Sequence, residues 1–294
     1  MDQVDIWFVN LGIQITNHQK GITIGGFTIA YYGLMIALGV LLGLALACFI
    51  AKKSGQDPEI YMDVALYGVI FGILGARIYY VVFNWDIYKD NLLQIFNLRA
   101  GGLAIYGGII AAVITVYVIA RRRKVPFPRL LDTAGYGLIT GQIVGRWGNF
   151  FNCEAFGGYT NNLFAMRLNV DLVNDYMISE ELLENEIVVN GITYIQVHPT
   201  FLYEGAWNFC VLLFLLWMRK RVHFEGEIFC LYLLGYGLGR FWIEGLRTDS
   251  LMLFGTGIAV SQLLSAALVV AMVGVLVYQR RRRKRKQVAQ EDDQ

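Results

Sequence analysis

Residues 28–51 read TIAYYGLMIALGVLLGLALACFIA, a run without a charged side chain. Because an α-helix rises 1.5 Å per residue, about 20 apolar residues are enough to cross the hydrocarbon layer of a bilayer. The whole chain of 294 residues has the same character: 56% of its residues are hydrophobic, 16% are charged, and its mean hydropathy is +0.48. Soluble domains average about 25% charged residues. The composition therefore predicts a helical membrane protein.

Further apolar runs follow, separated by short loops, and they leave no room for a second large domain. We expect an all-α polytopic membrane protein with a single transmembrane domain over residues 1–294. The seven predicted transmembrane helices are 28–51, 61–83, 101–120, 130–152, 198–218, 226–247 and 255–279.

The loops alternate in charge. Of the 25 Lys and Arg residues, 17 follow the first, third, fifth and seventh runs, and the last seven of these open a basic tail over 280–294. The positive-inside rule places that side in the cytoplasm, with the N-terminus outside and the C-terminus inside. We interpret the basic tail as a topological anchor near anionic lipids.

The longest loop, about 158–197, lies on the opposite side and is rich in Asp and Glu. Its segment EIVVNGITYIQV, residues 186–197, has Asn190-Gly191 between β-branched runs, which is a strong signal for a two-residue hairpin. We expect this loop to form a small external α+β head between the fourth and fifth helices.

Several ionisable side chains fall within the apolar runs, where a charge at the bilayer centre costs about 2.5–3.5 kcal/mol. From the helix rise, Arg77, Arg146 and Arg240 lie roughly 9–11 Å below the outer end of their helices. Tyr32 and Tyr106 lie at a similar level. The sequence thus predicts one polar layer in the outer half of the membrane.

The run GRWGNFFNCEAFG, residues 145–157, is the most polar of these segments. Arg146 and Asn149 share one helix face, and Asn152 and Glu154 continue the polar set into the loop. Amides in a span often serve only to hold helices together, but this many polar residues exceed that need.

In the sixth run, Tyr236, Arg240, Glu244 and Arg247 follow steps of four, four and three, so they stack on one helix face. One reading is an intrahelical ion-pair ladder that holds the bundle. The other is a cation site for an anionic lipid headgroup, in which Glu244 orients the guanidinium, since the planar fork of arginine binds phosphate at two points.

HPTFLYE, residues 198–204, adds His198, Tyr203 and Glu204 at the start of the fifth helix. A single histidine at a helix start is as often structural as functional. The three histidines of the chain are far apart, so no metal site is expected. Basic residues form no stripe with stacking aromatics, so no nucleic-acid partner is expected either.

Together with YYGLM (31–35), GARIYYV (75–81), GGLAIYGG (101–108) and GYGLGRFWIEGLR (235–247), these motifs closely resemble bacterial prolipoprotein diacylglyceryl transferases. The resemblance covers the whole chain, and residues 145–157 are similar to that family's signature. It implies an enzyme of the bacterial plasma membrane that needs no cofactor. It also implies transfer of the sn-1,2-diacylglyceryl group of phosphatidylglycerol to the lipobox cysteine of a prolipoprotein, with a thioether formed and glycerol 1-phosphate released.

Carried over by motif position, the resemblance implies that Arg146 and Arg240 hold the phosphate. The catalytic residues we expect are Arg146, Arg240, Glu154, Glu244, Tyr106 and Asn149. The substrate-binding residues we expect are Tyr32, Arg77, Asn152, Gly157, His198, Tyr236 and Arg247.

The chain departs from the family pattern at two positions. Tyr106 stands where many members have a histidine that has been proposed to deprotonate the thiol. A tyrosine with a pKa near 10 is a poor proton acceptor, so Glu154, Glu244, His198 or the arginine field acting on the thiol stay open as the source of activation. Phe201 stands where relatives often have glutamine.

Two other classes of protein compete with the transferase. A seven-span carrier or receptor for an anionic solute would use the same arginines without chemistry, but it should show internal repeats, helix breaks and polar residues in both leaflets. The inner half of this chain is apolar. A scaffold would need no buried cations.

Overall fold

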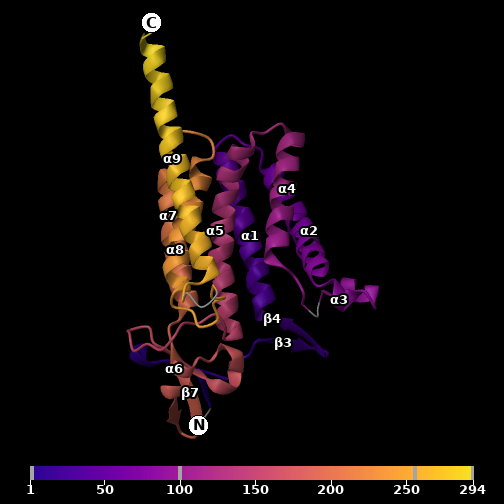
Figure 1. Ribbon diagram of the computed structural model, residues 1–294, viewed down its shortest axis with the longest axis vertical. Coiled ribbons are helices and arrows are strands. Elements are labelled where there is room, and N and C mark those ends of the chain that lie inside the picture. Colours follow the sequence, from indigo (N-terminus) through magenta and orange to yellow (C-terminus); the bar gives the residue numbers. More distant parts are fainter. Residues whose placement is uncertain (1–2, 99–100, 254–256, 293–294) are drawn as a thin grey trace. The chain divides into compact units, whose positions relative to one another are not determined.

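The computed structural model describes residues 3–98, 101–253 and 257–292, and most of them are helical (Figure 1). Within these residues, a helix of 18 residues or more overlaps each predicted run, although several begin or end elsewhere. These helices are α1 (Tyr31–Lys53), α2 (Pro58–Phe83), α4 (Ile105–Arg123), α5 (Phe127–Asn152), α7 (Thr200–Met218), α8 (Glu227–Glu244) and α9 (Val260–Asp292).

Five of the long helices, α1, α2, α4, α7 and α9, are long and apolar enough to cross a membrane. The protein is therefore a multi-pass membrane protein. Helices α5 and α8 are 26 and 18 residues long and carry the polar motifs of the sequence. The predicted first helix began at residue 28, but residues 28–30 belong to strand β4 (Phe27–Ala30), which pairs with β3 (Gly21–Ile24).

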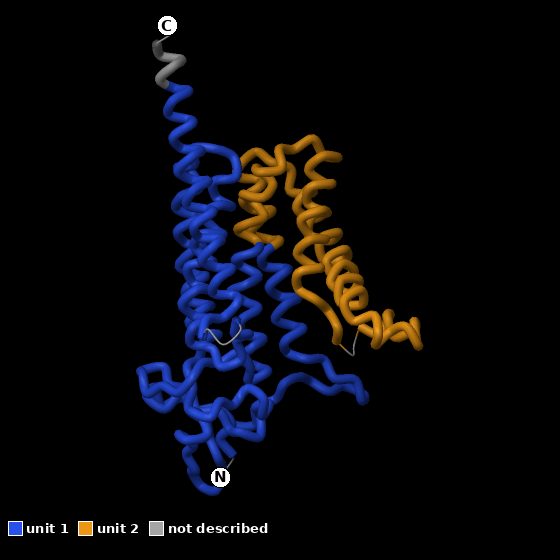
Figure 2. Tube along the Cα trace, viewed as in Figure 1, with its two compact units in different colours: residues 1–43, 138–294 blue, residues 44–137 orange. Residues whose placement is uncertain are grey.

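The chain forms two compact units, and each is described by itself (Figure 2). The larger unit comprises residues 1–43 and 138–294, and the smaller one comprises residues 44–137. Helices α1 and α5 each pass from one unit into the other along the chain.

In the larger unit, glycine lets α1 approach α5 closely. A Cβ atom on Gly39 would lie 3.1 Å from the carbonyl oxygen of Gly141. Helix α8 packs against both α7 and α9. Backbone approach of this kind stabilises helix pairs in lipid through van der Waals contact.

The basic tail begins as a continuation of the last long helix. Helix α9 continues without a break through residue 279, where the predicted span ended, to Asp292. Its Arg280 donates from Nε to Oε1 of Glu227, which is fully buried at the start of α8, over 2.7 Å. Because a buried carboxylate needs a charged or hydrogen-bonding partner, this ion pair ties the basic end of α9 to α8.

The head is an antiparallel sheet of five strands in the order β2-β1-β5-β7-β6. The hairpin β6 (Ile187–Val189) and β7 (Ile192–Val197) turns at Asn190 and Gly191, whose φ angles of 53° and 80° are those of the predicted two-residue turn. Strand β5 (Met166–Asn169) pairs with β7, and short helices such as α6 (Glu180–Glu184) complete the α+β character.

The prediction that the head lies wholly between two helices was wrong in one respect. The N-terminal strands β1 (Val4–Phe8) and β2 (Ile13–Thr16) join its sheet, β1 pairing directly with β5. Ile6 and Phe8 are buried in the same core as Leu168 and Ile195. The N-terminal segment has too few residues to bury these side chains by itself, so it completes a sheet begun far along the chain.

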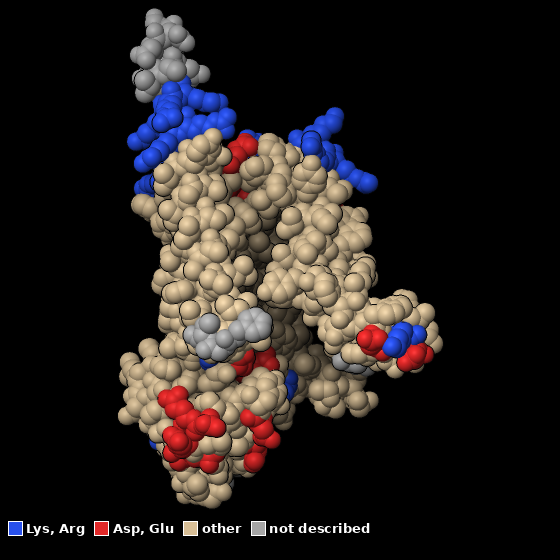
Figure 3. Space-filling model, viewed as in Figure 1, with Lys and Arg blue, Asp and Glu red and all other residues tan. Residues whose placement is uncertain are grey.

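Charges are segregated along the larger unit. Figure 3 shows Lys and Arg gathered where α9 leaves its apolar part, whereas Asp and Glu gather on the head. This is the distribution that the sequence predicted from its loops.

In the smaller unit, α2 and α4 pack through small residues. A Cβ atom on Gly75 would lie 2.7 Å from the carbonyl oxygen of Gly107, and one on Gly107 would lie 2.4 Å from the carbonyl oxygen of Gly75. Helix α2 begins at Pro58, and the side chain of Asp57 caps it by accepting from the Glu59 amide over 3.0 Å.

Candidate active site

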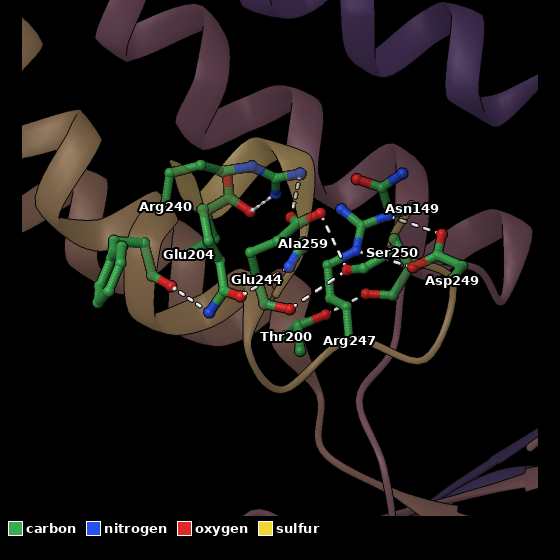
Figure 4. A network of polar contacts seen from close by, with 12 residues as sticks. Asn149, Thr200, Glu204, Arg240, Glu244, Arg247, Asp249, Ser250 and Ala259 are labelled. Atoms are coloured by element: carbon green, nitrogen blue, oxygen red, sulfur yellow. Dashed lines mark hydrogen bonds and ion pairs between the residues drawn. The ribbon is translucent and has the colours of Figure 1, made fainter. Parts of the chain in front are cut away.

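Glu204 of α7 lies at the centre of the polar cluster in the larger unit. It is buried, with 2% of its surface exposed. Its Oε1 is 2.6 Å from Nη2 of Arg146 on α5, and its Oε2 accepts from Nη1 of Arg240 on α8 over 3.2 Å (Figure 4). One carboxylate therefore brings together the two arginines that the sequence predicted to lie at one depth.

Glu204 is a functional candidate that the sequence analysis did not single out. Its place in HPTFLYE, at the start of the fifth predicted helix, indicated no role by itself. The criterion that singled out the arginines also fits Glu204, because it is an ionisable side chain in an otherwise apolar helix. The sequence did not show which residues contact Glu204, because they lie on helices distant in the chain.

Glu244 extends the cluster along α8. It forms an ion pair with Nη2 of Arg240, the i,i+4 contact that the spacing allows. Ser250 donates from Oγ to Oε1 of Glu244 over 2.9 Å and to its backbone carbonyl over 3.2 Å. Ser250 was not predicted, and it orients the carboxylate from the loop that follows α8.

Arg247 does not belong to the intrahelical ladder that was one of the two readings of its spacing. Helix α8 ends at Glu244, so Arg247 lies beyond the regular spacing and binds Asp249 at two points, over 2.9 Å and 2.7 Å. Burial alone would raise the pKa of Asp249, but its hydrogen bond with Arg247 and the nearby positive charge hold that pKa below its ordinary value. Arg247 is thereby neutralised by an unpredicted aspartate.

The end of α5 continues the network into the motif 145–157. Nη1 of Arg146 donates to Oδ1 of Asn149 over 3.4 Å, and Nδ2 of Asn149 donates to Oε1 of Glu154 over 2.9 Å. Asn149 therefore links a cation to a carboxylate. Asn152 is the last residue of α5 and half-buried, and its side chain has no hydrogen bond to any residue that the structure describes.

The loop that carries Glu154 has unusual backbone geometry. Cys153 and Ala155 have φ angles of 52° and 57°, in the left-handed region that side chains with a Cβ atom rarely adopt. The hydroxyl of Thr200 donates to the carbonyl of Ala155, and Thr200 is buried. Such strain persists only where the surroundings hold it, which is common at functional sites.

Gly157 is clamped between two chain segments. Its amide donates to the carbonyl of His198 over 3.0 Å, and it forms a β-bridge with Arg247. The amide of Gly158 donates to the carbonyl of Leu246 over 2.9 Å. The clamp joins the loop after α5, the start of α7 and the loop after α8, so Gly157 acts through its backbone.

The side chain of His198, whose backbone carbonyl belongs to this clamp, contacts Tyr203. Its Nδ1 is 3.3 Å from the hydroxyl oxygen of Tyr203, to which Asn162 donates from Nδ2 over 2.8 Å. Burial lowers the pKa of the His198 imidazole below 6.5. The geometry favours a neutral ring at neutral pH.

This pKa shift gives a prediction for stability. Because the folded pKa is below the unfolded one, the contribution of neutral His198 is complete above about pH 6.5 and is lost as the pH falls below that value. We expect His198→Gln to lose less thermal stability than the wild type between about pH 7.5 and about pH 5, measured as Tm in detergent. An equal loss in both proteins would contradict the shift.

The two predicted tyrosines of the larger unit lie close to the helices that carry Arg146 and Arg240. The Tyr32 ring packs on α5, 2.8 Å from where a Cβ atom on Gly148 would be. Tyr236 lies one turn before Arg240 on α8 and stacks with Tyr232 at a centroid distance of 6.2 Å.

Arg77 belongs to the smaller unit, and all the N–H donors of its guanidinium are used. Its guanidinium donates to five backbone carbonyls, those of Gln94, Ile95, Asn97, Gly101 and Gly102, over 2.6–3.3 Å. An arginine has five N–H groups, so this cradle uses all of them.

Tyr106 also belongs to the smaller unit, near the start of α4, and it is 53% exposed. Its hydroxyl has no hydrogen-bond partner among the described residues. Phe201, the second departure, is buried in the core of the head and packs on Phe150 at a centroid distance of 4.9 Å. An apolar contact thus occupies the position where relatives often carry an amide.

The chemistry open to this site is that of fixed cations. Arg146 and Arg240 are both partly exposed, with 20% and 18% of their side-chain surface accessible, while the carboxylate that holds them is buried. Two planar guanidinium groups so placed can share one phosphate and stabilise negative charge that develops on it. No group of three His, Cys, Asp or Glu residues in the described ranges is arranged to hold a metal ion.

Comparison with known proteins points to one family. The model of the family described as prolipoprotein diacylglyceryl transferase matches residues 19–278. The chain is 44% identical over 260 residues to the phosphatidylglycerol–prolipoprotein diacylglyceryl transferase of Bacillus cereus strain Q1, covering 88% of this chain and 91% of that protein. It is 43% identical, with the same coverage, to the proteins of that name from Bacillus anthracis strain A0248 and Bacillus thuringiensis subsp. konkukian strain 97-27.

Proposed function

Because this chain belongs to the prolipoprotein diacylglyceryl transferase family, we propose that its arginine cluster is the site of diacylglyceryl transfer. The protein is a transferase of lipoprotein biosynthesis, and the comparisons give no support to a carrier or receptor. Its substrates are phosphatidylglycerol and the lipobox segment of a prolipoprotein. The cysteine thiol loses its proton to the medium, and its sulfur forms a C–S bond with the diacylglyceryl carbon. The bond between that carbon and the phosphate oxygen breaks, and glycerol 1-phosphate leaves with its phosphate more negative than before.

The single observation that carries this proposal is the shared contact of Arg146 and Arg240 with Glu204. Side chains held in place before the reaction stabilise the leaving phosphate without reorganisation, and they act more strongly on the transition state than on the bound lipid. Glu204 and Glu244 position the guanidinium groups. The phosphate accepts hydrogen bonds from the arginine N–H groups that face away from these carboxylates.

The remaining residues of the larger unit have supporting roles. Asn149 and Glu154 present a polar edge toward the incoming thiol, and cations nearby favour its thiolate form. Gly157, through its backbone, holds the loop of Glu154. Tyr32, Asn152, His198, Tyr236 and Arg247 line the approach of the substrates.

For the smaller unit we propose two different roles. Arg77, whose donors are all used, stabilises the loop between α2 and α4 and does not bind phosphate. Tyr106 lines the path of the substrates.

We expect Tyr106→Phe to keep turnover within about threefold of the wild type. The Tyr106 hydroxyl has no described hydrogen-bond partner that would prepare it to accept a proton, and loss of a general base costs about 10²-fold or more. Release of glycerol phosphate at saturating substrate measures the effect. A fall of that size would make the hydroxyl the base.

We also propose the topology that the charges support. The seven long helices cross the bacterial plasma membrane, with the acidic head and N-terminus outside and the basic tail in the cytoplasm. This orientation puts the arginine cluster in the outer leaflet, where a secreted precursor and its lipid donor meet.

The direct test is to incubate the purified protein with phosphatidylglycerol and a lipobox peptide. We expect glycerol phosphate in solution and a peptide heavier by one diacylglyceryl group. A peptide with serine in place of the lipobox cysteine is the control and should gain no mass. Absence of both products, under conditions where a Bacillus relative is active, would overturn the proposed function.

A further inference from the structure

A cleft of about 570 Å³ lies in the smaller unit between α2 and α4, apart from the arginine cluster. Three residues of α2 and six of α4 line it, and on each helix they recur at steps of four, so it runs along about two turns of both helices. Its principal lining residues are Asp63, Tyr67 and Phe71 of α2 and Ile114, Val118 and Arg122 of α4. Its volume is typical of a site for a small ligand, about 300–1,000 Å³.

The cleft lies away from the glycine contact of the two helices. Gly75 and Gly107 bring the backbones together, whereas large side chains line both helices closer to Asp63 and Arg122. Ile119 and Thr115 are buried on the α4 side. The glycine contact therefore lies beyond the Phe71 end of the lining, and Asp63, Arg122 and Arg123 lie at the other end, which we call the mouth.

The walls of the cleft are apolar. Tyr67, Phe71, Ile114 and Val118 are each between 42% and 57% exposed, and α2 and α4 are both candidate membrane spans. In a bilayer such a surface contacts hydrocarbon. The walls thus fit an acyl chain.

The mouth of the cleft carries one cation that has no partner among the described residues. Arg123 forms an ion pair with Asp63, and the exposed Arg122 beside it makes no hydrogen bond or ion pair with any described residue. Neighbouring Arg121 differs, because its Nε donates to the hydroxyl of Tyr117 over 3.0 Å. The Arg123–Asp63 pair neutralises itself, so Arg122 is the lining cation left to meet an anionic group at the mouth, among the residues that the structure describes.

We propose that this cleft binds one anionic glycerophospholipid, with an acyl chain along Tyr67, Phe71, Ile114 and Val118 and the phosphate on Arg122. Basic pockets between membrane helices are suited to anionic headgroups, and the apolar walls supply contact that a free phosphate could not use. By the charge rule, the lipid comes from the cytoplasmic leaflet. This site is separate from the proposed catalytic one and does not depend on it.

Photolabelling tests the proposal. The full chain is placed in phosphatidylcholine nanodiscs with a trace of phosphatidylglycerol that carries a diazirine on one acyl chain, and adducts are mapped by peptide mass spectrometry. We expect adducts within 67–71 or 114–118. Arg122→Gln should reduce them at least about fivefold, as expected for loss of one cation at an anionic lipid.

Arg121→Gln is the matched control, since it removes the same charge at the preceding residue and should leave these adducts unchanged. Adducts on the larger unit provide an internal reference for reconstitution. Phe71→Glu, which places a negative charge on the apolar wall, should cause the same loss as Arg122→Gln. Thermal unfolding of each variant shows that it is folded.

Three results would overturn the proposal: equal labelling by a phosphatidylcholine probe, labelling that persists in Arg122→Gln, or labelling that millimolar inorganic phosphate abolishes. The last would make the mouth a phosphate site without use of the walls. Selective labelling by phosphatidylglycerol that depends on Arg122 and Phe71 supports it.

Discussion

Replacing Arg240 with alanine should lower turnover at least about 10³-fold, because loss of a fixed cation at a developing phosphate charge has effects of this size. Arg240 forms ion pairs with both Glu204 and Glu244, so these two carboxylates hold its guanidinium in place before the lipid binds. Arg146→Ala should have a comparable effect, since Arg146 holds the other oxygen of Glu204. Glycerol phosphate release under single-turnover conditions measures the chemical step.

Two further variants separate chemistry from folding. Arg240→Lys keeps the charge but loses the planar fork, so we expect it to recover part of the activity and to remain well below the wild type. Arg282→Ala removes an exposed arginine of α9 and should leave turnover unchanged. If Arg240→Ala retained more than about a tenth of the wild-type rate while Tm was unchanged, the phosphate role of the cluster would be refuted.

Replacing Gly157 with alanine is the second change with a large expected effect. A Cβ atom there would lie 2.7 Å from the carbonyl oxygen of Leu246 and 2.8 Å from Cβ of His198, closer than such atoms approach in real structures. The clamp must open, which shifts the loop of Glu154. We expect turnover to fall about 10²-fold, as for a misplacement of about 1 Å, and stability to fall by about 1–3 kcal/mol.

Gly274→Ala is the matched control, because the structure leaves open space around a Cβ atom on that residue of α9. Turnover and Tm should then match the wild type. A Gly157→Ala protein with full activity would show that the clamp does not position the site.

The helices and their order could be predicted from the sequence because hydropathy is a property of each segment alone. The hairpin at Asn190-Gly191 was predicted for the same reason, as two residues specify its turn. The sheet of the head could not be assigned correctly, since Ile6 and Phe8 find their neighbours more than a hundred residues away. Short strands carry no local signal that identifies such a partner.

The candidate site shows the same division. Arg146, Arg240 and Glu244 were predicted because a charge in an apolar helix is costly without a role. Glu204, Asp249 and Ser250 were not singled out, although Glu204 binds both arginines, Ser250 binds Glu244 and Asp249 binds Arg247. Arg247 was placed on one helix face with Glu244 because the sequence does not show that α8 ends at Glu244.

The sequence alone was enough to establish a multi-pass membrane protein with a family signature and with cations where lipid would exclude them. Both conclusions follow from transfer free energies and motif spacing, which depend on residues close together in the chain. Which carboxylate holds which arginine depended on the folded arrangement of α5, α7 and α8. Ion pairs between helices are set by three-dimensional packing, and many pairings are compatible with the same spacing.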